Sequence, residues 1–288
     1  MHDVVRQLLQ RHAVGTRDDA VQALREIMQQ ITLLGLWRAR FFEHAAFYGD
    51  TALRLLHGLD RFSEDLDFTL LAPDAAFHLD RYLLDLTQEI TSFGFQVAIT
   101  EKRKSHQSAI RSAFLKGGTR ELLLSLTADE RIVAMIPANQ VLNIRFEVDT
   151  DPPGVVETVM HRLQHPIPFS VRTCSLPDLF AGKMHAVLCR SWKSRVKGRD
   201  WYDFEWFTAH HPELRLSHLE ARMRQSGHWI ESRPLTRTAF ASLLRSRIDT
   251  VDHAALRHDV FPFLRRSDAV DAWSATHFHT ISRRIVFV

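Results

Sequence analysis

The chain has little cysteine and no long apolar run, and both shortages narrow the class of protein. Its 2 cysteines, Cys174 and Cys189, lack metal-ligand spacing and are too sparse among 288 residues for a disulfide framework. No stretch of eighteen residues is apolar without a charge, and the N-terminal MHDVVRQLLQRH has neither the apolar core nor the cleavage site of a signal peptide. We therefore expect a soluble protein of the reducing cytoplasm that has no membrane partner.

Several common catalytic motifs are also absent. The chain holds 17 histidines, yet none belongs to a His-Glu-x-x-His motif, and neither a Gly-x-Ser-x-Gly elbow nor a Walker-type loop occurs. The pairs His210-His211 and His277-Phe278-His279 are expected to be surface or packing residues. The chemistry must therefore come from other side chains.

Charge is distributed unevenly along the chain. The net charge is +3, but residues 1–180 carry 19 Lys+Arg against 23 Asp+Glu, and residues 181–288 carry 18 against 11. The two parts thus differ as −4 against +7. Such asymmetry is expected if an acidic, metal-binding part works beside a basic part that holds a phosphate-rich partner. An ordinary solvated basic surface on helices explains the charges equally well.

The spacing of apolar residues predicts an α+β protein, in which a nucleotidyltransferase-like mixed sheet core with helices is followed by helices alone. Helices are predicted over the first ~40 residues and over 74–92, with Asp18 or Asp19 and Asp74 as their N-caps. Strands are predicted at 41–47, 66–71, 95–100, 108–115 and 141–149, with a hairpin turn at Gly117-Gly118. Beyond Pro177 the periodicity is helical. We place a core domain at 1–175 and a C-terminal helical domain at 176–288.

The segment from Tyr48 to Phe68 carries the strongest chemical pattern. Asp65 and Asp67 are two apart on a predicted strand, so both carboxylates project from one face and can share a hard cation. Without further evidence, an Asp-x-Asp pair more often consists of solvated residues at the end of a strand than of metal ligands. Gly49 also follows a strand and precedes a helix, a geometry in which backbone N–H groups meet a phosphate. A strand, a glycine turn, a helix and Asp-x-Asp on the next strand together indicate a polymerase-β-like nucleotidyltransferase.

Two stretches in this segment, GDTAL at 49–53 and RFSEDLDF at 61–68, resemble the first motif of the AbiEii/AbiGii toxin nucleotidyltransferases. That motif reads approximately Gly-Gly-Thr-Ala-Leu, followed by Arg-x-Ser-x-Asp-x-Asp-Phe. The resemblance implies that Gly49, Asp50, Thr51, Arg61 and Ser63 bind the nucleotide. Asp50 departs from the motif because it places a carboxylate where the family cradles the triphosphate. We expect this change to weaken nucleotide binding or to alter nucleotide choice.

A third carboxylate is expected on the predicted strand NIRFEVDT. Arg145 and Glu147 resemble the Lys-x-Glu or Lys-x-Asp element of the family. Glu147 and Asp149 lie on the same strand face, so either can complete the metal site with Asp65 and Asp67, and register favours Glu147. The alternative is the exposed face of an edge strand.

Two later motifs lie on predicted helices. SLPDLFAGKMHAVLCR, at 175–190, resembles the third family motif, which implies that Lys183 places a point charge on the triphosphate; the alternative is a lysine that reaches solvent. KGRDWYDFEWF, at 197–207, resembles the fourth motif, with Asp200 and Asp203 one helical turn apart. Asp200 is expected to orient Lys183 or to assist deprotonation of the acceptor, and Arg199 to pair with Asp200. The alternative is a helix N-terminus that favours aspartate, with Asp203 on the surface.

The resemblance, which covers residues 48–207, implies in-line transfer of a nucleotide from a nucleoside triphosphate, with Mg²⁺ (or Mn²⁺) held by the carboxylates. It further implies the toxin of a toxin–antitoxin or phage-defence pair with a cognate antitoxin, some members of which modify the acceptor end of tRNA. Arg190, Lys193, Arg195 and Lys197 form the expected RNA-binding stripe. Protein and small-molecule acceptors stay open.

Two other functions remain compatible with the same residues. The chain could be a degenerate nucleotide-binding module that acts by binding a partner, with Asp50 as the mark of its decay. It could also be a metal-dependent phosphohydrolase that directs the same carboxylates at water.

Overall fold

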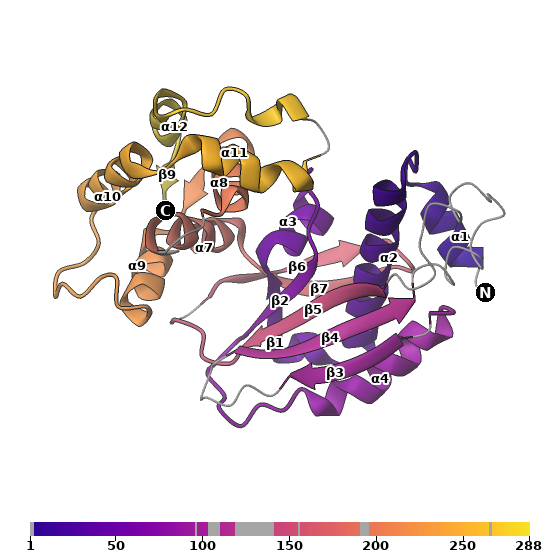
Figure 1. Ribbon diagram of the computed structural model, residues 1–288. Helices are drawn as coiled ribbons and strands as arrows, with labels where there is room; N and C mark the ends of the chain where they lie inside the picture. Colours follow the sequence, from indigo (N-terminus) through magenta and orange to yellow (C-terminus); the bar gives the residue numbers. More distant parts are fainter. Residues whose placement is uncertain are drawn as a thin grey trace. The chain divides into compact units, whose positions relative to one another are not determined.

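Figure 1 shows the computed structural model of the protein. The structure describes residues 3–95, 97–102, 110–118, 141–154, 156–190, 196–264 and 267–288. The chain forms two compact units. The first comprises Met1–Ala52, Glu64–Pro152 and Val159–Thr173, and the second comprises Leu53–Ser63, Pro153–Thr158 and Cys174–Val288. Two short segments that precede residue 175 therefore belong with the second unit.

The helices of the first unit differ in part from the predicted ones. α1 covers Asp3–Gln10, and α2 covers Arg17–Arg38. The N-cap of α2 is Thr16, which forms a capping box with Asp19, so the prediction of Asp18 or Asp19 as the cap was wrong. α4 covers Asp80–Ser92 and starts later than predicted, because the carboxylate of Asp74 accepts a hydrogen bond from the Ala76 backbone N–H in a turn. Gly94 follows α4 with φ +84°, a conformation that is typical of a glycine at the end of a helix.

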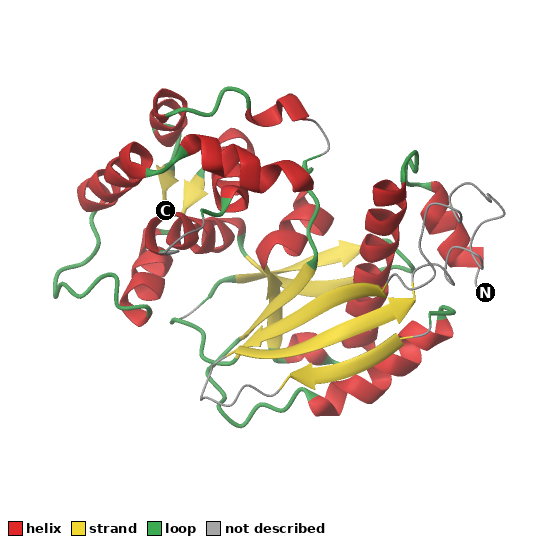
Figure 2. Cartoon of the chain, viewed as in Figure 1, coloured by secondary structure: helices red, strands yellow, loops and turns green. Residues whose placement is uncertain are grey.

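A seven-stranded mixed sheet with the order β3-β4-β5-β2-β1-β7-β6 lies in the first unit (Figure 2). β2 pairs antiparallel with β1 and parallel with β5, and β1 pairs parallel with β7. The strands are β1 Ala45–Tyr48, β2 Asp65–Leu70, β3 Val97–Lys102, β4 Ile110–Gly118, β5 Val141–Asp149, β6 Thr158–Leu163 and β7 Phe169–Cys174. A mixed sheet with helices confirms the predicted α+β class.

The sheet corrects three local predictions. Gly117 and Gly118 lie inside β4, where they pair with β5, so the hairpin turn predicted there was wrong. Phe41–Glu43 is a 3-10 helix, and the strand that follows begins only at Ala45. β6 and β7 lie between the predicted strand at 141–149 and the predicted helices beyond Pro177, where no strand is predicted. Glycine and proline indicate turns only as a statistical tendency, and pairing with a neighbouring strand can outweigh that tendency.

The core of the first unit is aromatic. The ring of Phe68 on β2 lies 5.0 Å from Phe41, 5.2 Å from Phe47 and 4.7 Å from Phe146, measured between ring centroids. All four side chains are buried, and α2 and α4 pack against the same sheet (Figure 1). β2 and β5 are therefore held rigidly on one face, which leaves their other face available for polar side chains.

The second unit is mainly helical, which confirms the helical character predicted beyond Pro177 (Figure 2). Its helices are α7 Leu176–Cys189, α8 Gly198–His210, α9 Leu216–Gln225, α10 Arg237–Thr250, α11 His253–Val260 and α12 Ala275–Ser282, with 3-10 turns at Phe261–Phe263 and Ser267–Val270. β8 Glu213–Leu214 and β9 Val286–Phe287 form a small parallel pair. Within the described residues, no helix combines the length and the apolar character needed to cross a bilayer.

Candidate functional site

Acidic side chains gather on one face of β2 and β5. These two strands are parallel, and their register pairs Asp65 with Arg145 and Asp67 with Glu147. Between the two aspartates Leu66 is fully buried, as is Phe68 after them. Because side chains alternate along a strand, Asp65, Asp67 and Glu147 share the face opposite the aromatic core, as predicted. The side chain of Asp65 is 39% exposed and that of Glu147 is 25% exposed.

Register also separates the two candidates for the third carboxylate. Glu147 stands beside Asp67, whereas Asp149 stands two residues further along β5, beside Thr69. Oδ1 of Asp149 accepts a hydrogen bond of 3.0 Å from the backbone N–H of Asp151 in the following turn. The geometry therefore favours Glu147 as the partner of the two aspartates.

Arg145 lies among these acids and offsets their mutual repulsion. Its Nη1 lies 3.9 Å from Oδ2 of Asp65 and 3.7 Å from Oε1 of Glu147. Neighbouring carboxylates can stay ionised together only near a positive charge. The donors on this face are all carboxylate oxygens, which suits a hard divalent cation such as Mg²⁺ and not a soft metal. Such a cation would compete with Arg145 for Asp65 and Glu147.

The turn between β1 and α3 is built against Asp67. α3 covers Gly49–His57, and Gly49 has φ +82°, a conformation that favours glycine. A Cβ on Gly49 would lie 2.5 Å from Oδ2 of Asp67, so even the smallest side chain is excluded there. The Thr51 hydroxyl donates a hydrogen bond to the backbone carbonyl of Asp65, which ties α3 to β2. The predicted succession of strand, glycine turn, helix and acidic strand is therefore present.

Asp50 occupies the first turn of α3 and is half-buried. A carboxylate is electrostatically favoured at this end of a helix, because the unpaired backbone N–H groups carry partial positive charge. The same N–H groups are those that would face a phosphate. Asp50 is therefore stable where it lies, and it adds negative charge to the part of the chain expected to receive the triphosphate.

A second cluster lies within the second unit and joins a carboxylate to two cations. Nζ of Lys183 on α7 lies 2.5 Å from Oδ2 of Asp203 on α8. Arg61 donates two hydrogen bonds to the same carboxylate, from Nε to Oδ1 and from Nη2 to Oδ2, each 2.6 Å long. The side chains of Arg61 and Asp203 are fully buried, and that of Lys183 is 9% exposed. A two-bonded guanidinium of this kind holds a carboxylate in one orientation.

Electrostatics explain why this carboxylate is charged although it is buried. Burial by itself raises the pKa of Asp203, but the positive charges of Arg61 and Lys183 outweigh burial and hold the pKa below its ordinary value. Lys183 therefore faces a permanent negative charge, which fixes its ammonium group. The interpretation of Asp203 as a surface residue was wrong.

Asp200 has another described partner. Its Oδ2 accepts a hydrogen bond of 2.9 Å from Nη1 of Arg190, while the guanidinium of Arg199 lies over the ring of Phe263. The sequence pattern assigned the orientation of Lys183 to Asp200, whereas the contact found for Lys183 is with Asp203, one helical turn later. The pattern predicted the correct helix. Residues at i and i+3 lie on the same face, however, so only the packing around them decides which of the two contacts Lys183.

The remaining predicted residues are placed as follows. Ser63 and Thr51 are buried, and Arg61 serves as the buried anchor of Asp203, so a nucleotide contact for these three stays a prediction. In the expected RNA-binding stripe, Arg190 is engaged by Asp200, and Lys193 and Arg195 lie outside the described residues. Lys197 is half-buried, and burial lowers its pKa to about 8.

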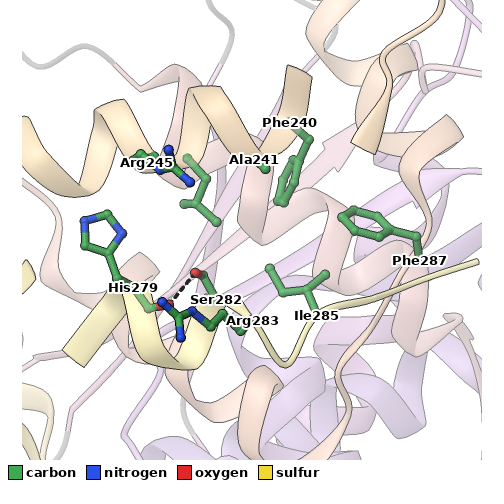
Figure 3. A pocket seen from close by; sticks show the side chains of 9 residues that line it. Phe240, Ala241, Arg245, His279, Ser282, Arg283, Ile285 and Phe287 are labelled. Atoms are coloured by element: carbon green, nitrogen blue, oxygen red, sulfur yellow. Dashed lines mark hydrogen bonds between the residues drawn. The ribbon is translucent and has the colours of Figure 1, made fainter. Parts of the chain in front are cut away.

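A separate basic pocket of about 520 Å³ lies within the second unit (Figure 3). Arg245 and Arg283 line it together with the rings of Phe240 and Phe287, whose centroids are 5.4 Å apart. Nε2 of His279, which also lines the pocket, is held by Asp249 at 2.7 Å. Within the described part of the chain, neither of the two arginines takes part in an ion pair. Guanidinium groups beside aromatic rings suit a ligand that carries both phosphate and a base.

The interaction that the sequence did not indicate is that of Arg61 with Asp203, which lie 142 residues apart. Arg61 belongs to the motif at 61–68 and Asp203 to the motif at 197–207, but neither motif predicts a contact between the two residues. Only the path of the chain brings the two together.

The comparisons with known proteins concern the family and the fold. The sequence model of the family described as nucleotidyl transferase AbiEii toxin, type IV TA system, matches residues 31–276. A crystal structure of a proposed nucleotidyltransferase from H. pylori superposes with a TM-score of 0.54 at 16% identity and covers 92% of this chain and 96% of its own. The crystal structure of JHP933 from Helicobacter pylori gives 0.52 at 16% identity, with 91% of each chain covered. These two likenesses concern the fold. None of the curated proteins matches the chain.

Proposed function

Because the chain belongs to the AbiEii family of nucleotidyltransferase toxins of type IV toxin–antitoxin systems, we propose that it transfers a nucleotide to the 3′ end of an RNA, with tRNA as the acceptor. Membership of this family makes a nucleoside triphosphate its substrate and an antitoxin its partner. The observation that carries the catalytic part of the proposal is the register of β2 and β5, which sets Asp67 beside Glu147 with Asp65 on the same face.

We assign the catalytic metal to Asp65, Asp67 and Glu147. Mg²⁺ is the ion that an all-carboxylate donor set on adjacent strands suits, and Mn²⁺ has the same preference. When bound, the ion would neutralise charge on the phosphates and lower the pKa of the acceptor hydroxyl. Asp149, held by the following turn, serves as an outer negative charge on the same strand.

The chain's own groups have distinct tasks in this mechanism. The backbone N–H groups of the Gly49 turn and the N-terminus of α3 bind phosphate oxygens, since both present donors and partial positive charge. Lys183 contributes a point charge to the triphosphate and thereby stabilises the pyrophosphate leaving group. Asp203 orients Lys183, and Arg61 orients Asp203. Asp200 on α8 binds Arg190 at the end of α7, the helix that carries Lys183.

The RNA part of the proposal is supported by the basic pocket of the second unit. Phosphodiester chains bind guanidinium groups, and unpaired bases bind aromatic rings. The pocket offers both kinds of contact, the guanidinium groups of Arg245 and Arg283 and the half-buried ring of Phe287. We propose that nucleotides near the acceptor end bind there.

The direct experiment is label transfer. Purified protein is incubated with Mg²⁺, each labelled nucleoside triphosphate in turn and total tRNA, and transfer of label to the RNA is measured. We compare the wild type with Asp67→Asn, Lys183→Met and the matched control Asp151→Asn, a change at an exposed residue that follows β5. We expect transfer by the wild type and the control, and a loss of at least about 100-fold in both site variants, since each removes a charge that stabilises the transition state.

The other outcomes are informative. Transfer that survives both Asp67→Asn and Lys183→Met would contradict the assigned site. Release of free nucleotide without labelled RNA would select a phosphohydrolase. Nucleotide binding without any transfer to RNA, protein or small-molecule acceptors would select a degenerate binding module.

A further inference from the structure

Three metal-ligating side chains meet within the second unit, on the helix that carries Lys183. His185 and Cys189 are four residues apart on α7, so they lie on one face of the helix. His228 reaches the same place from the turn that follows α9. One ligand atom of each, an imidazole nitrogen or the cysteine sulfur, lies within 4.8 Å of the other two. Within the described residues this is the one His, Cys, Asp or Glu cluster with that spacing.

The turn that presents His228 is well defined. Gly227 follows α9 in the left-handed region, with φ +75°. Its N–H donates to the carbonyl of Arg224, and the N–H of His228 donates to that of Met223, which together form a Schellman cap. The backbone at His228 is therefore held by two hydrogen bonds although its side chain is exposed, which preorganises a ligand on an otherwise open turn.

The histidines of the cluster are suited to ligation at neutral pH. Burial, reinforced by Arg222, lowers the pKa of His185 to about 4, so its imidazole is neutral and keeps a lone pair. The hydroxyl of Ser226 lies 2.8 Å from Nε2 of His185 and 2.9 Å from Nδ1 of His228, so one small polar group already bridges the two rings. A bound ion would take the place of this bridge.

We propose that His185, Cys189 and His228 bind one transition-metal ion of the zinc class. Two imidazoles and a thiolate form a borderline-soft donor set, which selects Zn²⁺ or Co²⁺ over Mg²⁺. In a tetrahedral zinc site such donors stand about 3.3–3.6 Å apart, so the three atoms must approach by roughly 1 Å, which side-chain rotation allows. Water completes the fourth position.

Binding requires one proton to leave. The Cys189 thiol loses its proton to solvent as the sulfur–metal bond forms. Burial raises the pKa of Cys189 to about 11, opposed by the charge of Arg247. The charged and titratable groups that act on His185 are Arg222, His228, Arg190 and His218.

The ion would join α7 to the turn after α9. Lys183 lies two residues before His185 on α7, so the bound metal would hold the helix that carries this lysine. The site does not depend on the proposed transfer reaction, and its donors are distinct from the carboxylates on β2 and β5.

Co²⁺ titration of the chelator-treated full chain tests the proposal, because a thiolate bound to cobalt gives a sulfur-to-metal charge-transfer band that carboxylates cannot produce. All variants carry Asp67→Asn, which weakens competing binding at the carboxylates. We expect the band in this background and in the control Cys174→Ser, whose sulfur is outside the cluster. Cys189→Ser should abolish the band, and His228→Ala should lower metal affinity by more than about 100-fold, beyond the loss typical of groups that only support a ligand.

The unfolding temperature distinguishes loss of the metal site from misfolding of a variant. His228 is exposed, so His228→Ala should unfold at the wild-type temperature in chelator. With Zn²⁺ the Asp67→Asn protein should show a higher Tm, and the same protein with His228→Ala should show none of this gain. A charge-transfer band that persists in Cys189→Ser, or an equal Tm gain in His228→Ala, would overturn the assignment.

Discussion

Asp203 is a single buried carboxylate that holds two cations. Removing a charge from water costs several kcal/mol, so a carboxylate with no exposure stays ionised only where positive partners surround it. Arg61 and Lys183 supply both partners at 2.6 and 2.5 Å. Neutralising this carboxylate would therefore weaken two buried ion pairs at once.

Asp203→Asn is expected to destabilise the protein strongly. The change removes the buried carboxylate charge that Arg61 and Lys183 share, which should lower the free energy of unfolding by about 3–5 kcal/mol. Asp200→Asn, on the same helix, is the matched control. It should cost only about 1 kcal/mol, because its partner Arg190 is 41% exposed and can turn to water. Urea unfolding of both variants measures the difference, and equal losses would contradict the central place given to Asp203.

Two buried histidines predict a loss of stability in acid. Burial lowers the pKa of His185 to about 4 and that of His218 to about 3, helped in both by Arg222. In the unfolded chain both pKa values are near 6.5, so below that pH the unfolded chain binds protons that the folded protein does not. The stabilisation is complete above pH 6.5 and falls as the pH drops toward 4, by at most about 1.4 kcal/mol per pH unit for each histidine.

The measurement is the free energy of unfolding at pH 7.5 and at pH 5. His218→Gln should reduce the difference between the two pH values, since it removes one of the linked protons. His258→Gln, at an exposed position on α11, should leave the difference unchanged. An unaltered pH dependence in His218→Gln would show that this histidine is not kept neutral by burial.

At the scale of elements, the connection from β1 to α3 decides how the acidic face is presented. Tyr48, the last residue of β1, pairs with Asp67, and Gly49 turns the chain directly over the carboxylate of Asp67. Thr51 then anchors α3 to the backbone of Asp65. The N-terminus of α3 and the acidic strand β2 therefore restrain each other's position.

Gly49→Ala should abolish transfer, and Gly58→Ala should spare it. Both glycines have positive φ, at +82° and +80°, so alanine strains the backbone at either site by about 1 kcal/mol or more. Only at Gly49 would the new Cβ meet another group, Oδ2 of Asp67 at 2.5 Å, while none lies within 4 Å of the Cβ at Gly58. Label transfer and urea unfolding separate the two effects. Similar activity of the two variants would contradict the role of close approach to Asp67.

At the scale of the whole molecule, the proposed division of labour rests on charge. The carboxylates that would hold Mg²⁺ lie in the first unit, and the basic pocket with Arg245 and Arg283 lies in the second. RNA that binds basic groups releases counterions, so the salt dependence of binding reports how many phosphates are bound.

Arg245→Gln combined with Arg283→Gln should weaken RNA binding at every sequence. The slope of log K against log salt should become shallower by about 0.7 for each phosphate of a single strand that the protein no longer binds. Fluorescence anisotropy with labelled RNA at several salt concentrations measures it. Arg233→Gln is the control, since Arg233 is exposed and paired with Glu231 at 2.7 Å. Wild-type affinity and slope in the double variant would exclude the pocket from RNA binding.

The local arrangement of the acidic face follows from the amino-acid sequence. Alternation along a strand is a property of the backbone, so Asp65 and Asp67 were assigned to one face and Leu66 and Phe68 to the core before any tertiary contact was known. The order of strand, turn, helix and strand was equally legible, because glycine at 49 and the apolar periods on either side are local features. The helical second unit followed for the same reason.

Only the tertiary structure decided which groups meet. Lys183 contacts Asp203 where the motif suggested Asp200, and Arg61 anchors that carboxylate from 142 residues away. His228 reaches His185 and Cys189 only because α9 packs on α7. A period of two or 3.6 residues predicts the face of the strand or helix on which a side chain lies. Which residue that side chain contacts depends on how distant elements pack to bury their apolar surfaces.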